Sequence, residues 1–259
     1  MNVYWLEQTE KDLPAQNDWL SADEISRIEG MRFVKRRSDW TLGRWTAKRA
    51  LASYCGMPPV SDALRTIEIR PEVSGAPVVF ISGHKHPISI SLSHRSGTAL
   101  CAIAPSGVAL GCDLELGEER HPAFITDYFT AGEQNYVMAL PRKVRWPRLA
   151  LLWSAKESAL KALRTGLRVD TRSVAVQLPD DGFDPSSWGS LQVGCADGKV
   201  FCGWHSTANG LVRTIVADPP PEFPVALRAS VFHALTADYT SSQALEIATP
   251  CDLYAIQRH

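Results

Sequence analysis

The sequence has no uninterrupted apolar run near the roughly 20 residues that a membrane-spanning helix needs. It begins without the basic segment and apolar stretch of a secretory leader, so we expect a cytoplasmic protein. The six cysteines show no C-x-x-C spacing, which favours reduced thiols that pack as small core residues. The formal net charge of -1 argues against a general attraction to nucleic acid or to an anionic membrane.

Two common catalytic signatures are also missing. No G-x-S-x-G elbow accompanies Ser93 and His94, so we reject a Ser-His hydrolase, and no P-loop is present. Any anion site must therefore come from local clustering of cations, which occurs at Arg32, Lys35, Arg36, Arg37, Arg44, Lys48 and Arg49. Arg37, Arg44 and Lys48 share a helical face, which is either a solvated surface or a site for a multiply charged phosphate ligand.

Helix and strand signals occur in the same order in two parts of the chain. Helices are predicted at 21–31, 38–55, 133–140 and 146–164, and strands at 66–70, 78–81, 88–93, 99–103, 108–114, 174–178, 191–195, 200–205 and 211–216. This order predicts an α+β fold made by pseudo-two-fold duplication of two similar α+β subdomains in one chain. We place these subdomains at 1–107 and 108–220, before a C-terminal extension at 221–259 with an amphipathic helix at 225–239.

Two carboxylates lie close together in one predicted strand. Alternation along residues 107–116 places Val108, Leu110, Cys112 and Leu114 on one face and Ala109, Gly111, Asp113 and Glu115 on the other. Asp113 and Glu115 then point the same way, about 7 Å apart. They form either a site for a hard cation such as Mg²⁺ or an exposed strand end whose acids face water.

A charged helical face and a strand end add further candidates. Glu157, Lys161 and Arg164 recur at helical spacing, although Glu157 and Lys161 alone are typical of a solvent-exposed helix pair. Ser93 and His94 end a predicted strand before a glycine turn. There His94 either donates to a phosphate oxygen or is satisfied within its own loop.

Taken in order, these residues resemble the 4'-phosphopantetheinyl transferase superfamily. Its signature, (V/I)-G-(V/I)-D followed by (F/W)-(S/C/T)-x-K-E-(A/S)-x-x-K, reads here Leu110-Gly-Cys-Asp113 and Trp153-Ser-Ala-Lys-Glu-Ser-Ala-Leu-Lys161. The blocks at Ser93-His94 and Tyr128-Phe-Thr-x-x-Glu133 are similar to the family pattern too. The chain length resembles that of the Sfp type, a pseudo-dimer in one chain, rather than the half-sized type that forms trimers.

The resemblance implies an enzyme of the holo-[acyl-carrier-protein] synthase type. Such an enzyme moves the phosphopantetheine arm of coenzyme A onto a serine of an apo acyl or peptidyl carrier protein and releases 3',5'-ADP. Mg²⁺, with Mn²⁺ as an alternative, would be held by Asp113, Glu115 and Glu157. Catalysis is expected from Glu157, Lys156 and Lys161, with Glu157 as metal ligand, general base or both. The expected coenzyme A contacts are Arg37, Arg44, Lys48, Ser93, His94 and Lys161.

The chain departs from the family pattern at two positions. Cys112 stands where Ile or Val is usual, on the core face, and Ala76 stands where many members carry a lysine. The carrier protein is expected to be an acidic helical bundle that docks against exposed apolar residues around Tyr128 and Phe129. We expect a monomer, because a duplicated chain can build the site internally, and no partner that is a nucleic acid or a membrane.

Two functions of other classes compete with this interpretation. A catalytically inactive module could bind coenzyme A or carrier proteins, but we expect such a relative to have lost one of its three acids, and all three remain. An unrelated Mg²⁺-dependent phosphotransferase or nuclease could use the same carboxylates. The lack of a P-loop and of a broad basic groove argues against it.

Overall fold

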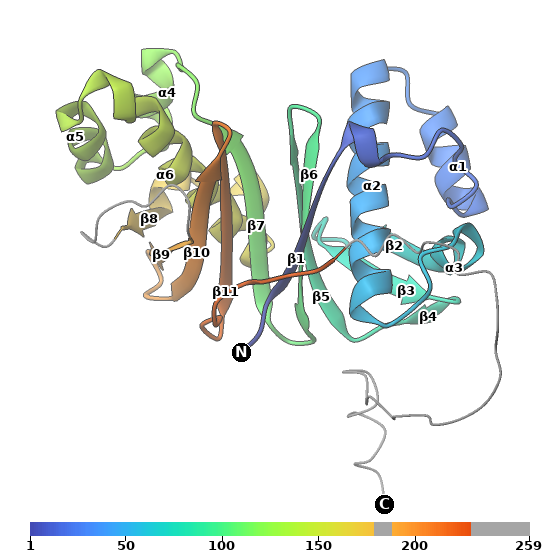
Figure 1. Ribbon diagram of the computed structural model, residues 1–259. Helices are drawn as coiled ribbons and strands as arrows, with labels where there is room; N and C mark the ends of the chain where they lie inside the picture. The colour runs from blue at the N-terminus through green and yellow to red at the C-terminus, as the bar shows by residue number, and fades with distance from the viewer. Residues whose placement is uncertain (179–187, 229–259) are drawn as a thin grey trace, which may run out of the picture.

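Two long helices lie on the outer faces of two sheets that pack against each other (Figure 1). The computed structural model describes residues 1–178 and 188–228. The helix α2 (Val34–Tyr54) covers the first sheet, and α6 (Arg142–Ala162) covers the second. The mixture of helices and sheets confirms the predicted α+β class, whereas the duplication stays a prediction.

The first sheet has the strand order β12-β1-β6-β5. Its members are β1 (Tyr4–Thr9), β5 (Ile88–Arg95), β6 (Thr98–Pro105) and β12 (Val225–Ala226). A smaller antiparallel sheet of β2 (Ile67–Pro71), β3 (Pro77–Ile81) and β4 (His84–Lys85) lies beside it, with η1 (Glu10–Asp12), α1 (Ala22–Glu29) and α3 (Ser61–Thr66) in the same half. The helix α1 begins at a capping box, in which Ser21 and Glu24 bond each other's backbone N–H groups.

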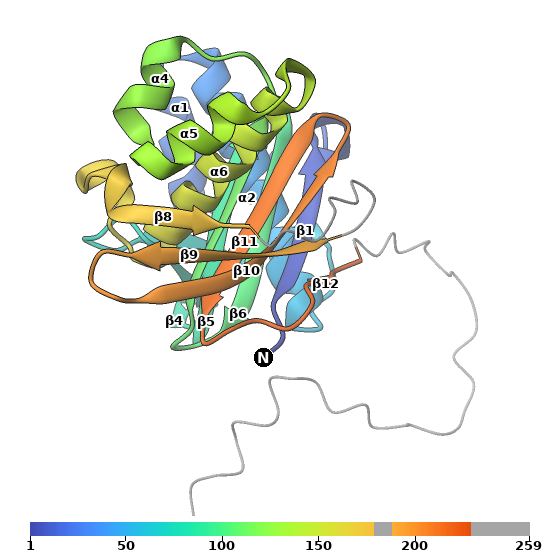
Figure 2. The same ribbon diagram turned by 90° about the vertical axis from the view of Figure 1, so that its left-hand side faces the viewer.

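The second sheet is antiparallel with the order β7-β11-β10-β9-β8. Its strands are β7 (Ala109–Leu116), β8 (Val174–Gln177), β9 (Gly189–Cys195), β10 (Val200–Ala208) and β11 (Leu211–Asp218). The predicted helix near 133–140 is α5 (Ala131–Ala139), and α4 (Pro122–Tyr128) is a helix that the sequence patterns did not predict. Short turns η2 (Gly166–Arg168) and η3 (Thr171–Ser173) follow α6. Figure 2 shows α4 and α5 together at one end of this sheet.

The two faces of β7 have the roles that alternation predicted. Val108, Leu110, Cys112 and Leu114 are buried in the core between the two sheets. Gly111 lies on the opposite face against α6, where an added Cβ would lie 1.8 Å from the carbonyl oxygen of Ser158. Only glycine permits this approach of strand and helix, which brings the charged residues of β7 and α6 to one place.

The chain returns to the first half after β11. Val225 and Ala226 pair in parallel with β1, and the Leu227 N–H donates to the Trp5 carbonyl. The helix predicted at 225–239 is therefore wrong for Val225 and Ala226, because the free edge of β1 offers their backbone groups partners. Residues 229–239 lie outside the described residues.

Cys101 and Cys112 are buried in the core, as predicted for small core residues, and Cys55, Cys195 and Cys202 are partly buried. Across residues 1–178 and 188–228, no helix combines the length and the apolar character that crossing a bilayer requires.

Candidate active site

Asp113 lies where the N-terminal half of the structure, which contains the first sheet, meets the C-terminal half, which contains the second sheet. It lies on β7 with a side chain that is 8% exposed, and its Oδ1 atom accepts from Ser93 Oγ at 2.7 Å and from Lys161 Nζ at 2.8 Å. Lys161 also donates to the Cys112 carbonyl at 2.9 Å. Burial lowers the pKa of Lys161, but Asp113 and its neighbours outweigh that effect, so the net shift is upward and the ammonium stays charged.

Two carboxylate oxygens at this junction are buried without a hydrogen-bond partner in the described part of the chain. They are Oδ2 of Asp113 and Oε1 of Glu157, which lies on α6. Burial, followed by the charge of Asp113, raises the pKa of Glu157 to about 7, while Lys161 opposes the shift. Buried oxygens without partners are costly in a folded protein, and a bound cation would satisfy both.

The third acid, Glu115, forms ion pairs with two arginines. Its Oε2 atom accepts from Arg120 at 2.8 Å and lies 3.6 Å from Nε of Arg95. Burial and then Asp113 raise the pKa of Glu115, and the two arginines lower it in part. Among the described residues, no three His, Cys, Asp or Glu side chains are arranged as a ready metal cluster. A metal site here would require Glu115 to exchange partners.

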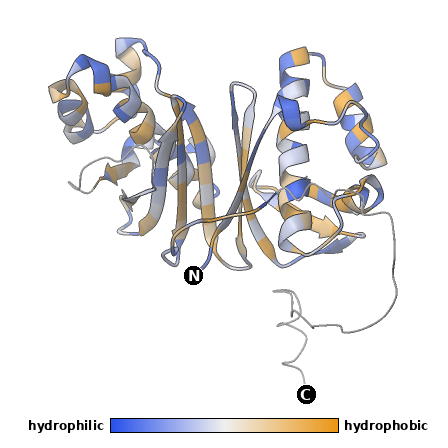
Figure 3. Cartoon of the chain, in the orientation of Figure 1, coloured by the Kyte–Doolittle hydropathy of each residue, from blue (hydrophilic) through white to orange (hydrophobic). Residues whose placement is uncertain are grey.

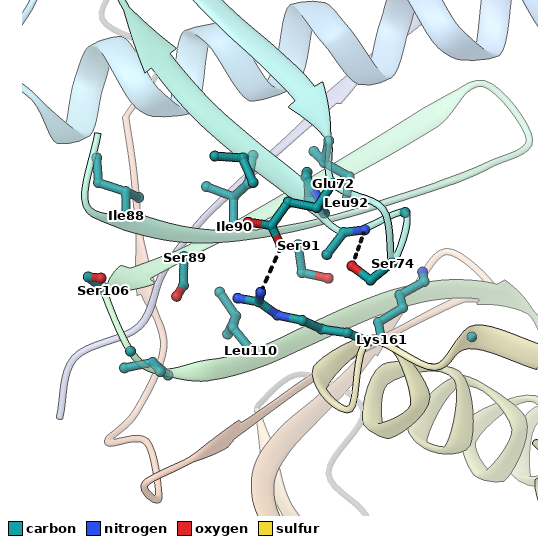
Figure 4. Close-up of a pocket in the computed structure, with 18 of the residues that line it drawn as sticks. Glu72, Ser74, Ile88, Ser89, Ile90, Ser91, Leu92, Ser106, Leu110 and Lys161 are labelled. Carbon is teal, nitrogen blue, oxygen red and sulfur yellow. Dashed lines mark hydrogen bonds and ion pairs between the residues drawn. The ribbon is translucent and has the colours of Figure 1, made fainter. Parts of the chain in front are cut away.

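A cavity of about 950 Å³ lies along the same junction (Figure 4). The side chains of Ser89, Ser91, Leu110 and Lys161 line it, together with the loop between β2 and β3. Across its mouth, Arg164 at the end of α6 donates to Glu72 of the first half at 3.0 Å. The cavity is large enough for a cofactor-sized ligand and is bordered by Lys161 of the carboxylate cluster.

His94 points to the other side of β5 from Ser93. It lines a second cavity of about 560 Å³ with Arg36, Trp40 and Arg44 of α2. Its Nδ1 atom lies 4.0 Å from the Asp39 carboxylate, and burial lowers its pKa despite that carboxylate. The Arg44 guanidinium lies 4.7 Å from the Trp40 ring centroid. This cavity therefore gathers cations and an aromatic face on one side of α2.

Two of the predicted cations on α2, Arg37 and Lys48, do not line that cavity. Lys48 is fully buried and bonds Glu24 and the carbonyls of Trp19 and Leu64. Arg37 donates to the Met31 carbonyl. Arg37, Arg44 and Lys48 all lie on α2, but Lys48 faces the core. The cations that line the cavity include Lys35 and Arg36, which belong to the predicted basic cluster but not to the predicted coenzyme A contacts.

Lys156 also departs from its predicted place. Its ammonium is fully buried and lies 2.8 Å from Glu133 of α5, and it donates to the carbonyls of Thr171 and Val174. It therefore points away from Asp113, because neighbouring residues on a helix face directions about 100° apart. These buried contacts fit a structural role for Lys156, and its catalytic role stays a prediction.

The predicted partner surface needs a similar correction. Phe129 is fully buried and packs against Trp153, whereas Tyr128 is 38% exposed. Exposed apolar side chains of α5 are Tyr136 and Met138 instead. Figure 3 shows hydrophobic and hydrophilic residues mixed on α4 and α5. Sequence position alone gave no signal that Phe129 faces inward.

Sequence analysis also missed the arginines around Glu115. Arg95 follows the Ser93-His94 pair directly, and Arg120 lies five residues after Glu115. The short distance in sequence from Glu115 was an available signal for Arg120 but not for Arg95. Their contact with Glu115 depends on the path of the chain between β7 and α4.

Part of the chain matches the model of a known protein family. Residues 109–215 match the family model described as the 4'-phosphopantetheinyl transferase superfamily. This range runs from β7 to β11 and includes Asp113, Glu115, Glu157 and Lys161. A search of curated proteins found no match. The family match confirms the resemblance based on the two motifs at the level of the superfamily, and it supports phosphopantetheinyl transferase activity in general.

Proposed function

We propose that this chain, which carries the superfamily match over β7 to β11, transfers the phosphopantetheine arm of coenzyme A to a serine of an apo acyl or peptidyl carrier protein. The main support for this proposal is that Asp113, Glu157 and Lys161 lie together beside a cavity of about 950 Å³. Within the described residues, this group combines two buried carboxylate oxygens that lack a hydrogen-bond partner with a charged lysine. Such a site suits a ligand that brings several negative charges together with a divalent cation.

The carboxylates fit Mg²⁺ by donor chemistry. Mg²⁺ prefers hard oxygen ligands and is usually held by one or two carboxylates plus substrate phosphate oxygens. Asp113 and Glu157 offer one free oxygen each, and Glu115 would join them after release from Arg120. When bound, the cation would neutralise charge on the pyrophosphate of coenzyme A. Mn²⁺ has the same ligand preference and is the alternative.

The cations of the second cavity fit the ribose phosphate of coenzyme A. Arg36, Arg44 and His94 line it, and guanidinium groups bind phosphate oxygens in a bidentate manner. Burial lowers the pKa of Arg44 to about 10, while Glu24 opposes the shift, so Arg44 remains charged at neutral pH. We infer that these side chains, rather than Arg37 and Lys48, hold the 3'-phosphate. His94 keeps its predicted contact.

The chain's own residues can support the transfer itself. The serine oxygen attacks the β-phosphorus, the bond from that phosphorus to the bridging oxygen breaks, and 3',5'-ADP leaves. Burial raises the pKa of Glu157 to about 7 in the protein without metal, which suits a general base for the serine proton. A cation held by the same carboxylate would lower that pKa, so the base and ligand roles of Glu157 compete. Lys161 stabilises negative charge on the phosphate oxygens. Ser93 acts through Asp113, because its hydroxyl is already bonded to that carboxylate.

We further propose that the carrier protein docks over α4 and the start of α6. Tyr128 is partly exposed there, and Arg142 and Lys143 are exposed at the beginning of α6. Acidic partners would be attracted by these cations. Tyr128→Ala should raise the KM for the carrier without changing the KM for coenzyme A. An unchanged KM for the carrier would remove Tyr128 from the docking surface.

Intact-mass measurement of an apo carrier protein tests the activity directly. The carrier is incubated with the chain, coenzyme A and Mg²⁺, and a gain of one phosphopantetheine group is expected. Glu157→Gln should abolish the gain, and so should chelation of the metal, whereas Asp170→Asn, a change in an exposed carboxylate, should not. Coenzyme A binding without any transfer to carriers of several classes would favour the inactive binding module.

A further inference from the structure

Arg120 links the candidate metal site to a cluster of aromatic side chains between α4 and α6. It lies in the segment between β7 and α4, and one terminal nitrogen donates to Glu115 Oε2 at 2.8 Å. On its other side, the guanidinium carbon lies 5.4 Å from the ring centroid of Phe124. The same cation therefore contacts a candidate metal ligand and an aromatic side chain of α4.

Arg120 has a second carboxylate within reach. Glu118 Oε1 lies 3.7 Å from the Arg120 guanidinium and already forms an ion pair with Arg95. The side chain of Glu118 is 49% exposed, whereas that of Glu115 is 13% exposed. An arginine released from Glu115 would thus find a more solvated acceptor without crossing the site.

Phe124, the aromatic ring beside Arg120, contacts one partly exposed side chain and one side chain of α6. The Phe124 ring centroid lies 5.1 Å from that of Tyr128 and 5.0 Å from that of Trp153. Tyr128 is partly exposed, and Trp153 precedes Glu157 by one helical turn. Side chains at positions i and i+4 lie on the same helix face, so the cluster borders the site directly.

We propose that Arg120 is a positioning residue that restrains Glu115 in the metal-free protein and moves to Glu118 when a divalent cation binds. The inference rests on the proposed metal site. A guanidinium and a metal ion compete for the same carboxylate oxygens, and the two positive charges repel each other at short range. Metal binding must therefore break the ion pair between Arg120 and Glu115, which weakens the affinity for the metal. Glu118 lowers this free-energy cost because it accepts the released guanidinium.

Titration of the purified full chain with Mn²⁺ alone, followed by electron paramagnetic resonance, tests this proposal without reference to activity. Arg120→Met keeps an apolar stem near Phe124 and removes the charge, so the Kd for Mn²⁺ should fall about 3- to 10-fold. Glu118→Gln removes the alternative acceptor, so the Kd should rise by about 2- to 5-fold. In the Arg120→Met background, Glu118→Gln should have less effect, since no guanidinium remains to be accepted.

A matched control lies in the first half. Arg70 also combines a carboxylate partner, Glu68 at 2.9 Å, with an aromatic ring, Phe80 at 4.3 Å. Arg70→Met should leave the Kd for Mn²⁺ unchanged. Arg120→Gln provides a second charge-removing variant if Arg120→Met does not fold, as judged by thermal denaturation.

Asp113→Asn separates failure of this inference from failure of the proposed metal site. If Asp113→Asn abolishes Mn²⁺ binding but Arg120→Met leaves it unchanged or weaker, the restraint by Arg120 is overturned and the metal site stands. If Asp113→Asn binds Mn²⁺ as the wild type does, the metal site is misplaced and both proposals fall. Stronger binding by Arg120→Met together with loss in Asp113→Asn is the expected result.

Discussion

The hydroxyl of Ser93 donates to the carboxylate of Asp113 at 2.7 Å and joins two strands, β5 and β7, that share no backbone ladder in the described sheets. The same hydroxyl accepts from the Leu114 N–H at 3.2 Å. Two residues earlier, Ser91 accepts from the Cys112 N–H at 2.9 Å but does not touch Asp113. Serine hydroxyls thus replace backbone pairing where the two halves meet.

Ser93→Ala should therefore affect both stability and the metal site. It leaves the Leu114 N–H without its partner, at a cost of about 1–3 kcal/mol, and removes one of the groups that orient Asp113. We expect a lower melting temperature and a Kd for Mn²⁺ raised about 10-fold, the low end of what loss of an orienting partner costs. Ser91→Ala is the matched control, with a similar stability loss and unchanged metal affinity. Equal effects of both variants on the Kd would contradict a special role for Ser93.

The cations of the second cavity should distinguish coenzyme A from its form without the 3'-phosphate. Arg36→Gln should weaken binding of coenzyme A by about 10-fold, because a charged contact to phosphate is lost, and should scarcely change binding of dephospho-coenzyme A. Calorimetric titration with both ligands measures the difference. Lys48→Met should instead lower thermal stability, since it leaves Glu24 buried without its lysine. Equal weakening for both ligands in Arg36→Gln would place the phosphate elsewhere.

The buried pair of Lys156 and Glu133 should behave as a structural unit. Lys156→Met alone should destabilise the protein by about 3–5 kcal/mol, because Glu133 would keep a buried charge without a partner. The double variant Lys156→Met, Glu133→Gln should regain part of this loss and retain transfer activity. Chemical denaturation and the mass assay give the two readouts. A double variant that is stable yet inactive would return Lys156 to the catalytic residues.

His205 should make stability depend on pH in the acid range. Burial, followed by the charge of Arg148, lowers its pKa from 6.5 to about 4. Between these values the unfolded chain binds a proton that the folded chain does not, so the free energy of unfolding falls as the pH drops from 6.5 to 4. His205→Gln should remove on the order of 2 kcal/mol of this fall. Melting temperatures at pH 7.5 and 4.5 report the change, with exposed His84→Gln as the control that should track the wild type.

Local patterns predicted many of the helices and strands, although not α4, and they predicted the direction of the key acids. Alternation along β7 placed Asp113 and Glu115 on the face opposite Cys112 and Leu114, and the structure agrees. This works because the side-chain period of a strand is fixed by its backbone. The same reasoning failed for Val225 and Ala226, where a partner strand more than 200 residues away in sequence decided the structure.

By itself, the sequence determined the α+β class, the superfamily resemblance and the set of acids, because these depend on residue types and short-range spacing. Tertiary structure alone decided which cations line a cavity and which face the core. Lys48 and Lys156 look like candidates in a linear motif, yet each is buried against a glutamate from another helix. The engagement of Glu115 by Arg120 likewise depends on the path of the chain after β7. Charge at a site is set by neighbours brought together through folding, which no local pattern encodes.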